Sequence, residues 1–150
     1  MTDPLTIRSA RTEDVPDIVA MLADDPLGAT RERPGDPRYA VAFAELDADP
    51  RQLLVVAEAG GEVVGTLQLT LIPGLSRRGA TRALIESVRV RSDQRGAGLG
   101  QRLVEWAIEQ ARQRGCALVQ LTTDASRTEA HRFYARLGFT ASHVGMKLTF

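Results

Sequence analysis

Three glycines at alternate positions form the part of this sequence best suited to binding a charged ligand. They lie in Arg95-Gly96-Ala97-Gly98-Leu99-Gly100, after a run with strand character and before a run with helix periodicity. Glycine lets a backbone turn tightly and bring its N–H groups close to a ligand, and a helix N-terminus adds a partial positive charge. Arg95 adds one full charge, so the segment predicts a cradle for a phosphate or another anion.

The spacing of these glycines fits neither of two common nucleotide-binding loops. A Walker loop requires a lysine directly after its last glycine, and Gln101 follows Gly100 here. The dinucleotide fingerprint needs a glycine where Gln101 stands and an acid about 20 residues later, where the chain has Val119 and Gln120. On these residues alone, the interpretation that the glycines only turn the chain stays open.

Glu86 is a candidate proton acceptor. It shares one face of a predicted strand with Leu84, Val88 and Val90, so a carboxyl group stands in a largely apolar row. Burial there would raise its pKa and suit it to take a proton from an ammonium group. The simpler interpretation is an ion pair with a nearby arginine.

Tyr134 lies on the apolar face of a predicted helix. Ala130, Phe133 and Leu137 share that face at the helical spacing of three and four residues. The spacing alone indicates a core tyrosine whose hydroxyl has a polar partner.

Alternating strands and helices must position these groups. Strands are predicted over residues 5–8, 52–58, 63–72, 82–90, 118–122 and 143–150, and helices over 12–23, 37–46, 99–115 and 126–137. Gly60 and Gly61 predict a hairpin turn, and Pro and Gly residues mark loops at 24–37 and 73–79. Without a repeat or a linker, the 150 residues predict one mixed α/β domain, residues 1–150.

Composition excludes several classes of function. Nineteen basic and nineteen acidic residues give a net charge of zero, which argues against nucleic acid or an anionic membrane as a partner. No apolar run approaches the length of a membrane span, and the N-terminus lacks an export pattern, so we expect a cytoplasmic protein. One cysteine and two histidines allow neither an internal disulfide nor a zinc cluster, and we expect no metal.

Two motifs together resemble the GNAT superfamily of acetyl-CoA-dependent N-acetyltransferases, in particular its small bacterial members. They are Arg95-x-x-Gly98-x-Gly100 after Val88-Arg89-Val90, and the later block from Ala130 to Phe139, which reads AHRFYARLGF. The order of predicted elements matches that family over nearly the whole chain. The resemblance implies a mostly antiparallel central sheet of six to seven strands, flanked by about four helices, with strands splayed at the acetyl-CoA site.

The resemblance also implies where acetyl-CoA, the cosubstrate, binds. The strand ending at Val90 would pair with the pantetheine arm, and residues 95–101 would hold the pyrophosphate. Many members have an asparagine before the last helix that contacts the arm, and here the candidates are Asp124 and Arg127, although Asp124 could simply start the helix through a capping box at Ser126 to Glu129. The cofactor-binding candidates are Val88, Arg89, Val90, Arg95, Gly96, Ala97, Gly98, Leu99, Gly100, Gln101, Asp124 and Arg127.

For the chemistry, the resemblance implies direct transfer of acetyl to a primary amine. Tyr134 would protonate the leaving thiolate as general acid, and Glu86 would help to deprotonate the amine as general base. His131 and His143 stay open as neighbours of the site or of the acceptor pocket. Cys116 is expected to be a small buried hydrophobic residue.

The acceptor is less determined. The resemblance places residues 24–37 and 73–82 on the acceptor side, and the second stretch carries only basic charges, which favours an acceptor with a carboxylate or phosphate. A small-molecule amine is favoured. A non-catalytic acyl-CoA-binding or regulatory module and a protein or peptide acetyltransferase are the alternatives, and pairing of last strands in many members makes a homodimer possible.

Overall fold

Five strands form one sheet in the computed structural model, which describes residues 4–150. Their order follows the chain: β1 (Thr6–Ser9), β2 (Gln52–Ala59), β3 (Glu62–Ile72), β4 (Arg82–Val90) and β5 (Leu118–Gln120). Neighbours are antiparallel except β4 and β5, which are parallel. The mixed α/β class and the mostly antiparallel sheet are confirmed, but the sheet has five strands rather than six to seven.

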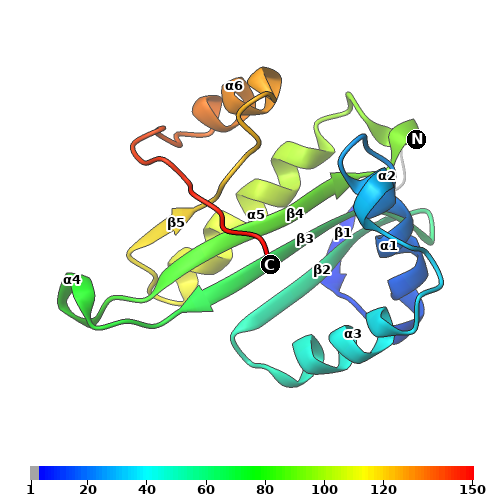
Figure 1. Cartoon of the computed structure of the whole chain (residues 1–150), viewed down its shortest axis with the longest axis horizontal. Helices are drawn as coiled ribbons and strands as arrows, with labels where there is room; N and C mark the ends of the chain where they lie inside the picture. Colours follow the sequence, from blue (N-terminus) through cyan, green and yellow to red (C-terminus); the bar gives the residue numbers. More distant parts are fainter. Residues whose placement is uncertain (1–3) are drawn as a thin grey trace.

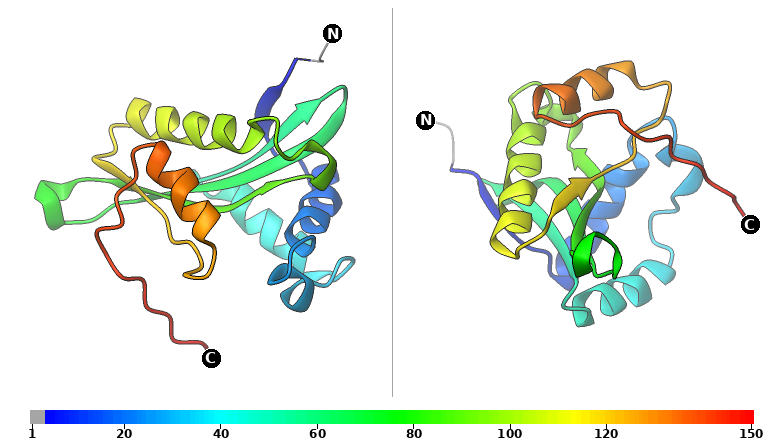
Figure 2. Two further views of the ribbon diagram at one scale, coloured as in Figure 1. Left: turned by 90° about the horizontal axis from the view of Figure 1, so that it is seen from above. Right: turned by 90° about the vertical axis from the view of Figure 1, so that its left-hand side faces the viewer.

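Helices cover both faces of this sheet (Figures 1 and 2). The long helix α5 (Leu99–Gln113) packs on one face with an apolar stripe at helical spacing. On the other face lie α1 (Val15–Ala23) and α3 (Arg38–Ala48), packed on Val56 of β2 through Ile18 and Phe43. The larger core, on the α5 face, buries Val55, Ala57, Val64, Leu67, Leu69, Ala83, Ile85, Leu99, Leu103, Val104, Ala107 and Ala111.

The last helix, α6 (Thr128–Arg136), sits beside the start of α5. Its Phe133 lies 3.8 Å from the position that a Cβ on Gly100 would take, so the two helices are near neighbours there. The predicted helix face is confirmed, because Ala130, Phe133, Tyr134 and Leu137 are all partly buried while the residues between them are exposed.

Short elements occupy the two predicted loops and the turns beside them. These are α2 (Gly28–Arg31), α4 (Ser76–Gly79) and the 3₁₀ turns η1 (Thr12–Asp14) and η2 (Ser92–Gln94). In α4, at the tip of the β3–β4 hairpin, Arg77 and Arg78 have positive φ angles of 57° and 60°, so this turn is left-handed. None of the helices within residues 4–150 combines the length and apolarity needed to cross a membrane.

A bulge at Ser87 changes the faces of β4. Ser87 has a φ of 55°, and the pairing with β3 slips between Thr66 and Gln68, so β4 carries one extra residue there. Ala83 and Ile85 before the bulge face α5, and so do Val88 and Val90 after it. The predicted single face of Leu84, Glu86, Val88 and Val90 is therefore wrong.

The C-terminal segment, residues 140–150, is extended but unpaired. The predicted strand at 143–150 does not form in the part of the chain that the structure describes, which removes a sixth strand from the sheet. Gly145 passes Thr122, just beyond β5, and the segment then leaves on the side of α1 and α3 (Figure 2). A strand needs both an alternating sequence pattern and a neighbouring strand to which it can hydrogen-bond. Within the described part of one copy of the chain, this segment has the pattern but no such neighbour.

Candidate active site

An opening between β4 and β5 is the centre of the candidate site. The two strands pair only from Arg82 to Leu84 on β4 and from Leu118 to Gln120 on β5. Beyond that point β4 continues to Val90 without β5 beside it, and α6 and the N-terminus of α5 flank the gap (Figure 1). Backbone groups on this side of β4 can therefore pair with an extended ligand, as the resemblance implied for Val88 to Val90.

The glycine segment turns the chain from β4 into α5. Gly96 and Gly98 have φ angles of 87° and 79°, which side chains other than glycine rarely adopt. Gly98 directly precedes α5, and no side chain caps that helix end. The first N–H groups of a 15-residue helix are thus left for a ligand, and the partial positive charge there suits a phosphate group.

The guanidinium of Arg95 already has partners within the protein, so it is less available to a ligand than the sequence alone suggests. Its Nε donates to the carbonyl of Val90 at 3.3 Å, and one terminal nitrogen donates to the carbonyl of Asp24 at 3.3 Å. The same nitrogen is 3.7 Å from the carboxylate of Asp24, an exposed pair. Arg95 therefore links the glycine segment to the end of α1 and shares its charge with Asp24.

Tyr134 is held by two aromatic rings. Phe133 and Phe139 contact it edge to face, with ring centroids 5.0 and 5.8 Å away. Burial raises the pKa of its phenol above the ordinary 10.0, and the positive charges of Arg127 and Arg89 oppose that shift only in part. The hydroxyl is therefore protonated at neutral pH and able to donate a proton.

Glu86 is exposed, which corrects the expectation that it is buried. Because the bulge at Ser87 reverses the alternation, Glu86 points away from α5, on the face covered elsewhere by α1 and α3. Glu86 is paired with Gln68 of β3, and Arg89 is paired with Thr66. Gln68 and Thr66 are two residues apart on β3, so their partners Glu86 and Arg89 lie on the same face of the sheet. A carboxylate and a guanidinium, Glu86 and Arg89, thus share this face of β4.

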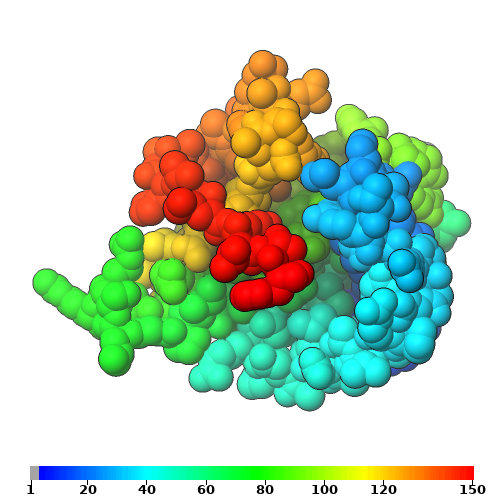
Figure 3. Space-filling view, in the orientation of Figure 1, coloured from blue at the N-terminus to red at the C-terminus, as the bar shows by residue number. Residues whose placement is uncertain are grey.

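Polar residues that the sequence analysis did not assign extend this face. Gln68 and Thr70 on β3 both donate to the side-chain oxygen of Gln52 on β2, at 2.9 and 2.8 Å. Alternating polar positions within the apolar run of β3 were the available signal. Figure 3 shows this side of the sheet as a hollow between α2, α3 and the C-terminal segment.

The loop before α6 is organised by Asp124. Its carboxylate accepts hydrogen bonds from the backbone N–H, at 2.9 Å, and the hydroxyl of Ser126, and these hold its pKa below the ordinary value. The capping box predicted at Ser126 to Glu129 is wrong, because the residue that precedes the helix is Arg127 and no side chain caps it. Asp124 thus has a structural use, and Arg127 stays exposed near Tyr134.

Both histidines are exposed. His131 contacts the carbonyl of Asp124 through Nε2 at 2.9 Å, and His143 contacts the hydroxyl of Ser142 through Nδ1 at 2.7 Å. His131 therefore belongs to the loop before α6, and His143 to the C-terminal segment.

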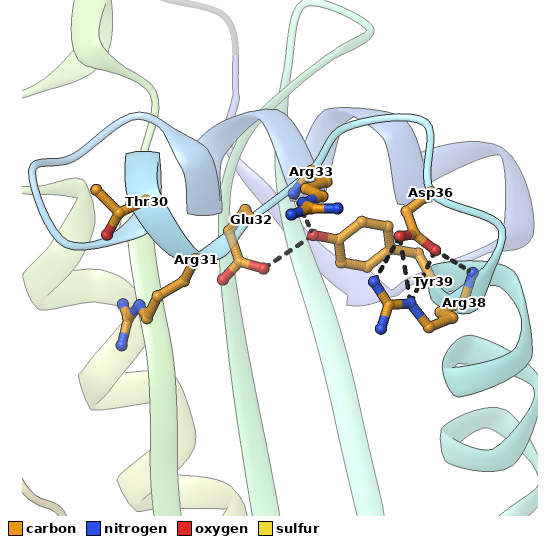
Figure 4. Close-up of a pocket in the computed structure, with 7 residues that line it drawn as sticks. All are labelled: Thr30, Arg31, Glu32, Arg33, Asp36, Arg38 and Tyr39. Carbon is orange, nitrogen blue, oxygen red and sulfur yellow. Dashed lines mark hydrogen bonds and ion pairs between the residues drawn. The ribbon is translucent and has the colours of Figure 1, made fainter. Parts of the chain in front are cut away.

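A separate cavity of about 550 Å³ lies along the α2–α3 connection (Figure 4). The Tyr39 hydroxyl donates to Glu32 and accepts from the backbone N–H of Arg33, both at 2.9 Å, and Arg38 pairs with Asp36 at 2.7 Å. The cavity lies within the segment expected to border the acceptor, but its lining includes none of Glu86, Arg89 and Tyr134.

Comparisons with known proteins point in one direction. The sequence model described as the acetyltransferase (GNAT) family matches residues 17–139. An aminoalkylphosphonate N-acetyltransferase of Salmonella typhimurium is 33% identical over 91% of this chain and 86% of its own. An L-methionine sulfoximine/L-methionine sulfone acetyltransferase of Pseudomonas paraeruginosa is 35% identical over 95% and 86%.

A solved structure is similar over almost the whole chain. The crystal structure of a transcriptional regulator from Bacillus halodurans has a TM-score of 0.94 and 51% identity, covering 98% of this chain and 100% of that one. Fold and sequence are thus shared with proteins whose descriptions name acetyl transfer and, in this case, regulation.

Proposed function

The chain belongs to the acetyltransferase (GNAT) family and is an acetyl-CoA-dependent acyltransferase, and we propose that its acceptor is the primary amine of a small molecule. The observation that carries this proposal is the meeting of three features at one opening: the unpaired edge of β4, the uncapped start of α5 and the protonated Tyr134. The first two suit an extended ligand with a phosphate group, and the third suits proton transfer.

The binding residues follow from this arrangement. Backbone groups of Val88 to Val90 would hold the pantetheine arm, and the N–H groups of residues 96–101 would hold the pyrophosphate. Arg127, exposed directly before α6, is available to the phosphates, whereas Asp124 is occupied with Ser126.

Acetyl-CoA supplies an activated thioester, and this chain supplies the proton transfers. Glu86, exposed on the acceptor side, accepts a proton from the acceptor's ammonium, directly or through a water molecule, and the neutral amine then attacks the thioester carbonyl. The C–N bond forms and the C–S bond breaks. Tyr134 donates a proton to the departing thiolate. Both steps complete with no covalent bond to the enzyme.

The relatives indicate which amines to test. Both are described by acceptors that carry an amine together with an acidic group, a phosphonate in one case and a carboxylate in the other. Small amines that also carry a phosphonate or a carboxylate are therefore the first acceptors to test with this chain.

Acetyl-CoA and CoA, but neither NAD nor ATP, are expected to stabilise the protein in a thermal-shift titration. A ligand at 100 times its Kd adds about 2.7 kcal/mol, which raises the Tm of a domain of this size by several degrees. Free-thiol release with a panel of amines then measures transfer. Stabilisation without thiol release would contradict transfer and indicate a non-catalytic acyl-CoA-binding or regulatory module, and no shift with acetyl-CoA would remove the proposed site.

A homodimer is part of the same proposal. Val144, Met146, Leu148 and Phe150 alternate along the C-terminal segment and are 82–112% exposed. Such a row is costly in water, and β5 is an edge strand of the sheet. Reciprocal addition of each segment to the β5 edge of a second copy would bury eight such side chains, which approaches the roughly 1,000 Å² of a specific interface.

Substituting both Leu148→Ser and Phe150→Ser is expected to convert the dimer to a monomer. Light scattering after size exclusion should give twice the chain mass for the unchanged protein and the chain mass for the double variant. Val41→Ser, which alters an apolar side chain exposed on α3, serves as control and should leave the dimer intact. If the unchanged protein is a monomer, the proposed pairing of C-terminal segments with the β5 edges of a second copy is contradicted.

A further inference from the structure

Arg89 is a charged side chain of the candidate site that is not fully hydrogen-bonded within the described part of the protein. Its side chain is 18% exposed, and its Nε is buried without a hydrogen-bond partner among residues 4–150. The carboxylate of Asp25 lies 3.1 Å from that Nε but is not aligned to accept from it. One terminal nitrogen donates to the carbonyl of Val88 at 3.0 Å.

Asp25 holds Arg89 in place. Its carboxylate accepts a hydrogen bond of 2.5 Å from the backbone N–H of Gly28 at the start of α2. Burial alone would raise the pKa of Asp25, but this hydrogen bond and the charge of Arg89 outweigh it and leave the pKa below 3.8. Asp25 is therefore ionised and keeps the guanidinium oriented on its strand.

Arg89 also lies within electrostatic reach of the proposed acid. Its positive charge acts to lower the pKa of Tyr134, against the larger effect of burial, while its Nε lies 3.1 Å from Asp25 in the α1–α2 connection. The bulge at Ser87 places Glu86 on the same face of β4. Glu86 forms no ion pair within the described residues, so the carboxylate and the guanidinium stand in one row without neutralising each other.

We propose that Arg89 binds the acidic group of the acceptor and so selects zwitterionic amines, whose ammonium faces Glu86 and whose phosphonate or carboxylate faces Arg89. This assignment rests on the proposed function. A guanidinium has five N–H donors in a planar fork and binds such anions through two parallel hydrogen bonds. Because Arg89 is already partly desolvated and oriented by Asp25, little further ordering is needed when the anion arrives.

The test compares amines that differ in the acidic group. 2-Aminoethylphosphonate and β-alanine carry the anion, and propylamine does not. In Arg89→Gln, kcat/KM for the two acidic amines is expected to fall about 10- to 100-fold, mainly through KM, because a charge-assisted hydrogen bond is lost. The value for propylamine should fall far less, so that the preference for acidic amines is lost. Arg89→Lys should restore part of that preference, and Arg112→Gln, at an exposed position of α5, should match the unchanged protein.

A second readout needs no turnover. 2-Aminoethylphosphonate should raise the Tm of the CoA-saturated protein, propylamine should not, and Arg89→Gln should abolish the shift while stabilisation by CoA itself persists. An equal loss for all three amines, or no loss for the acidic ones, would overturn the role of Arg89. Absence of thiol release with every amine in the unchanged protein would instead overturn the proposed function and the acceptor assignment with it.

Discussion

Tyr134→Phe is expected to lower kcat by about 10²–10⁴-fold while the stabilisation by acetyl-CoA is preserved. The substitution removes one oxygen and leaves the ring that Phe133 and Phe139 hold edge to face. Binding and packing are therefore retained, and only the hydroxyl proposed to protonate the leaving thiolate is lost. Thiol release under saturating acetyl-CoA and acceptor measures kcat directly.

The pH profile separates this role from a structural one. Because burial raises the pKa of Tyr134 above 10.0, the phenol stays protonated throughout the neutral range, and loss of activity from its ionisation should begin only above pH 10. Tyr134→Phe should lack that alkaline limb. Tyr39→Phe changes the other tyrosine of the chain, outside the site, and should leave both kcat and the profile unchanged. An unchanged kcat in Tyr134→Phe would remove the acid role.

The elements around the site could be predicted because they follow from local pattern. The α5 stripe and the α6 face have helical periodicity, and both are formed as expected. The turn between β4 and α5 could be predicted as well, since Gly96 and Gly98 adopt the left-handed angles that glycine permits. Each of these features depends on residues close together in the chain.

The acceptor side could not be predicted in the same way. Ser87 has a left-handed backbone conformation that its residue type does not indicate, and that one residue decides which face Glu86 takes. The contact of Asp25 with Arg89 joins positions 64 residues apart through the packing of α1 and α2 against the sheet. Such features depend on tertiary structure, and the acceptor selection proposed for this chain rests on them.

Asp14 is a buried carboxylate whose substitution should lower the stability of the fold. It is 4% exposed, accepts two hydrogen bonds from Arg8 at 2.8 and 3.0 Å, and accepts a third from the backbone N–H of Arg11 at 2.7 Å. These contacts tie β1 to η1 and α1. Asp14→Asn removes the charge that Arg8 needs, so the free energy of unfolding should fall by about 3 kcal/mol, the lower end for a broken buried pair because Arg8 keeps Glu58 at 2.7 Å.

The effect should depend on pH with a definite sign. The hydrogen bonds from Arg8 are the largest cause that lowers the pKa of Asp14 in the folded protein below the 3.8 of the unfolded chain. The stability that its charge provides is therefore complete above that value and is lost as the pH falls through the lower, folded one. Urea unfolding should show a gap between Asp14→Asn and the unchanged protein that is widest at neutral pH and becomes smaller as the pH is lowered below 3.8. Asp17→Asn, an exposed carboxylate on α1, should change stability by less than about 0.5 kcal/mol throughout, and an equal cost for the two variants would contradict the role of the Arg8–Asp14 pair.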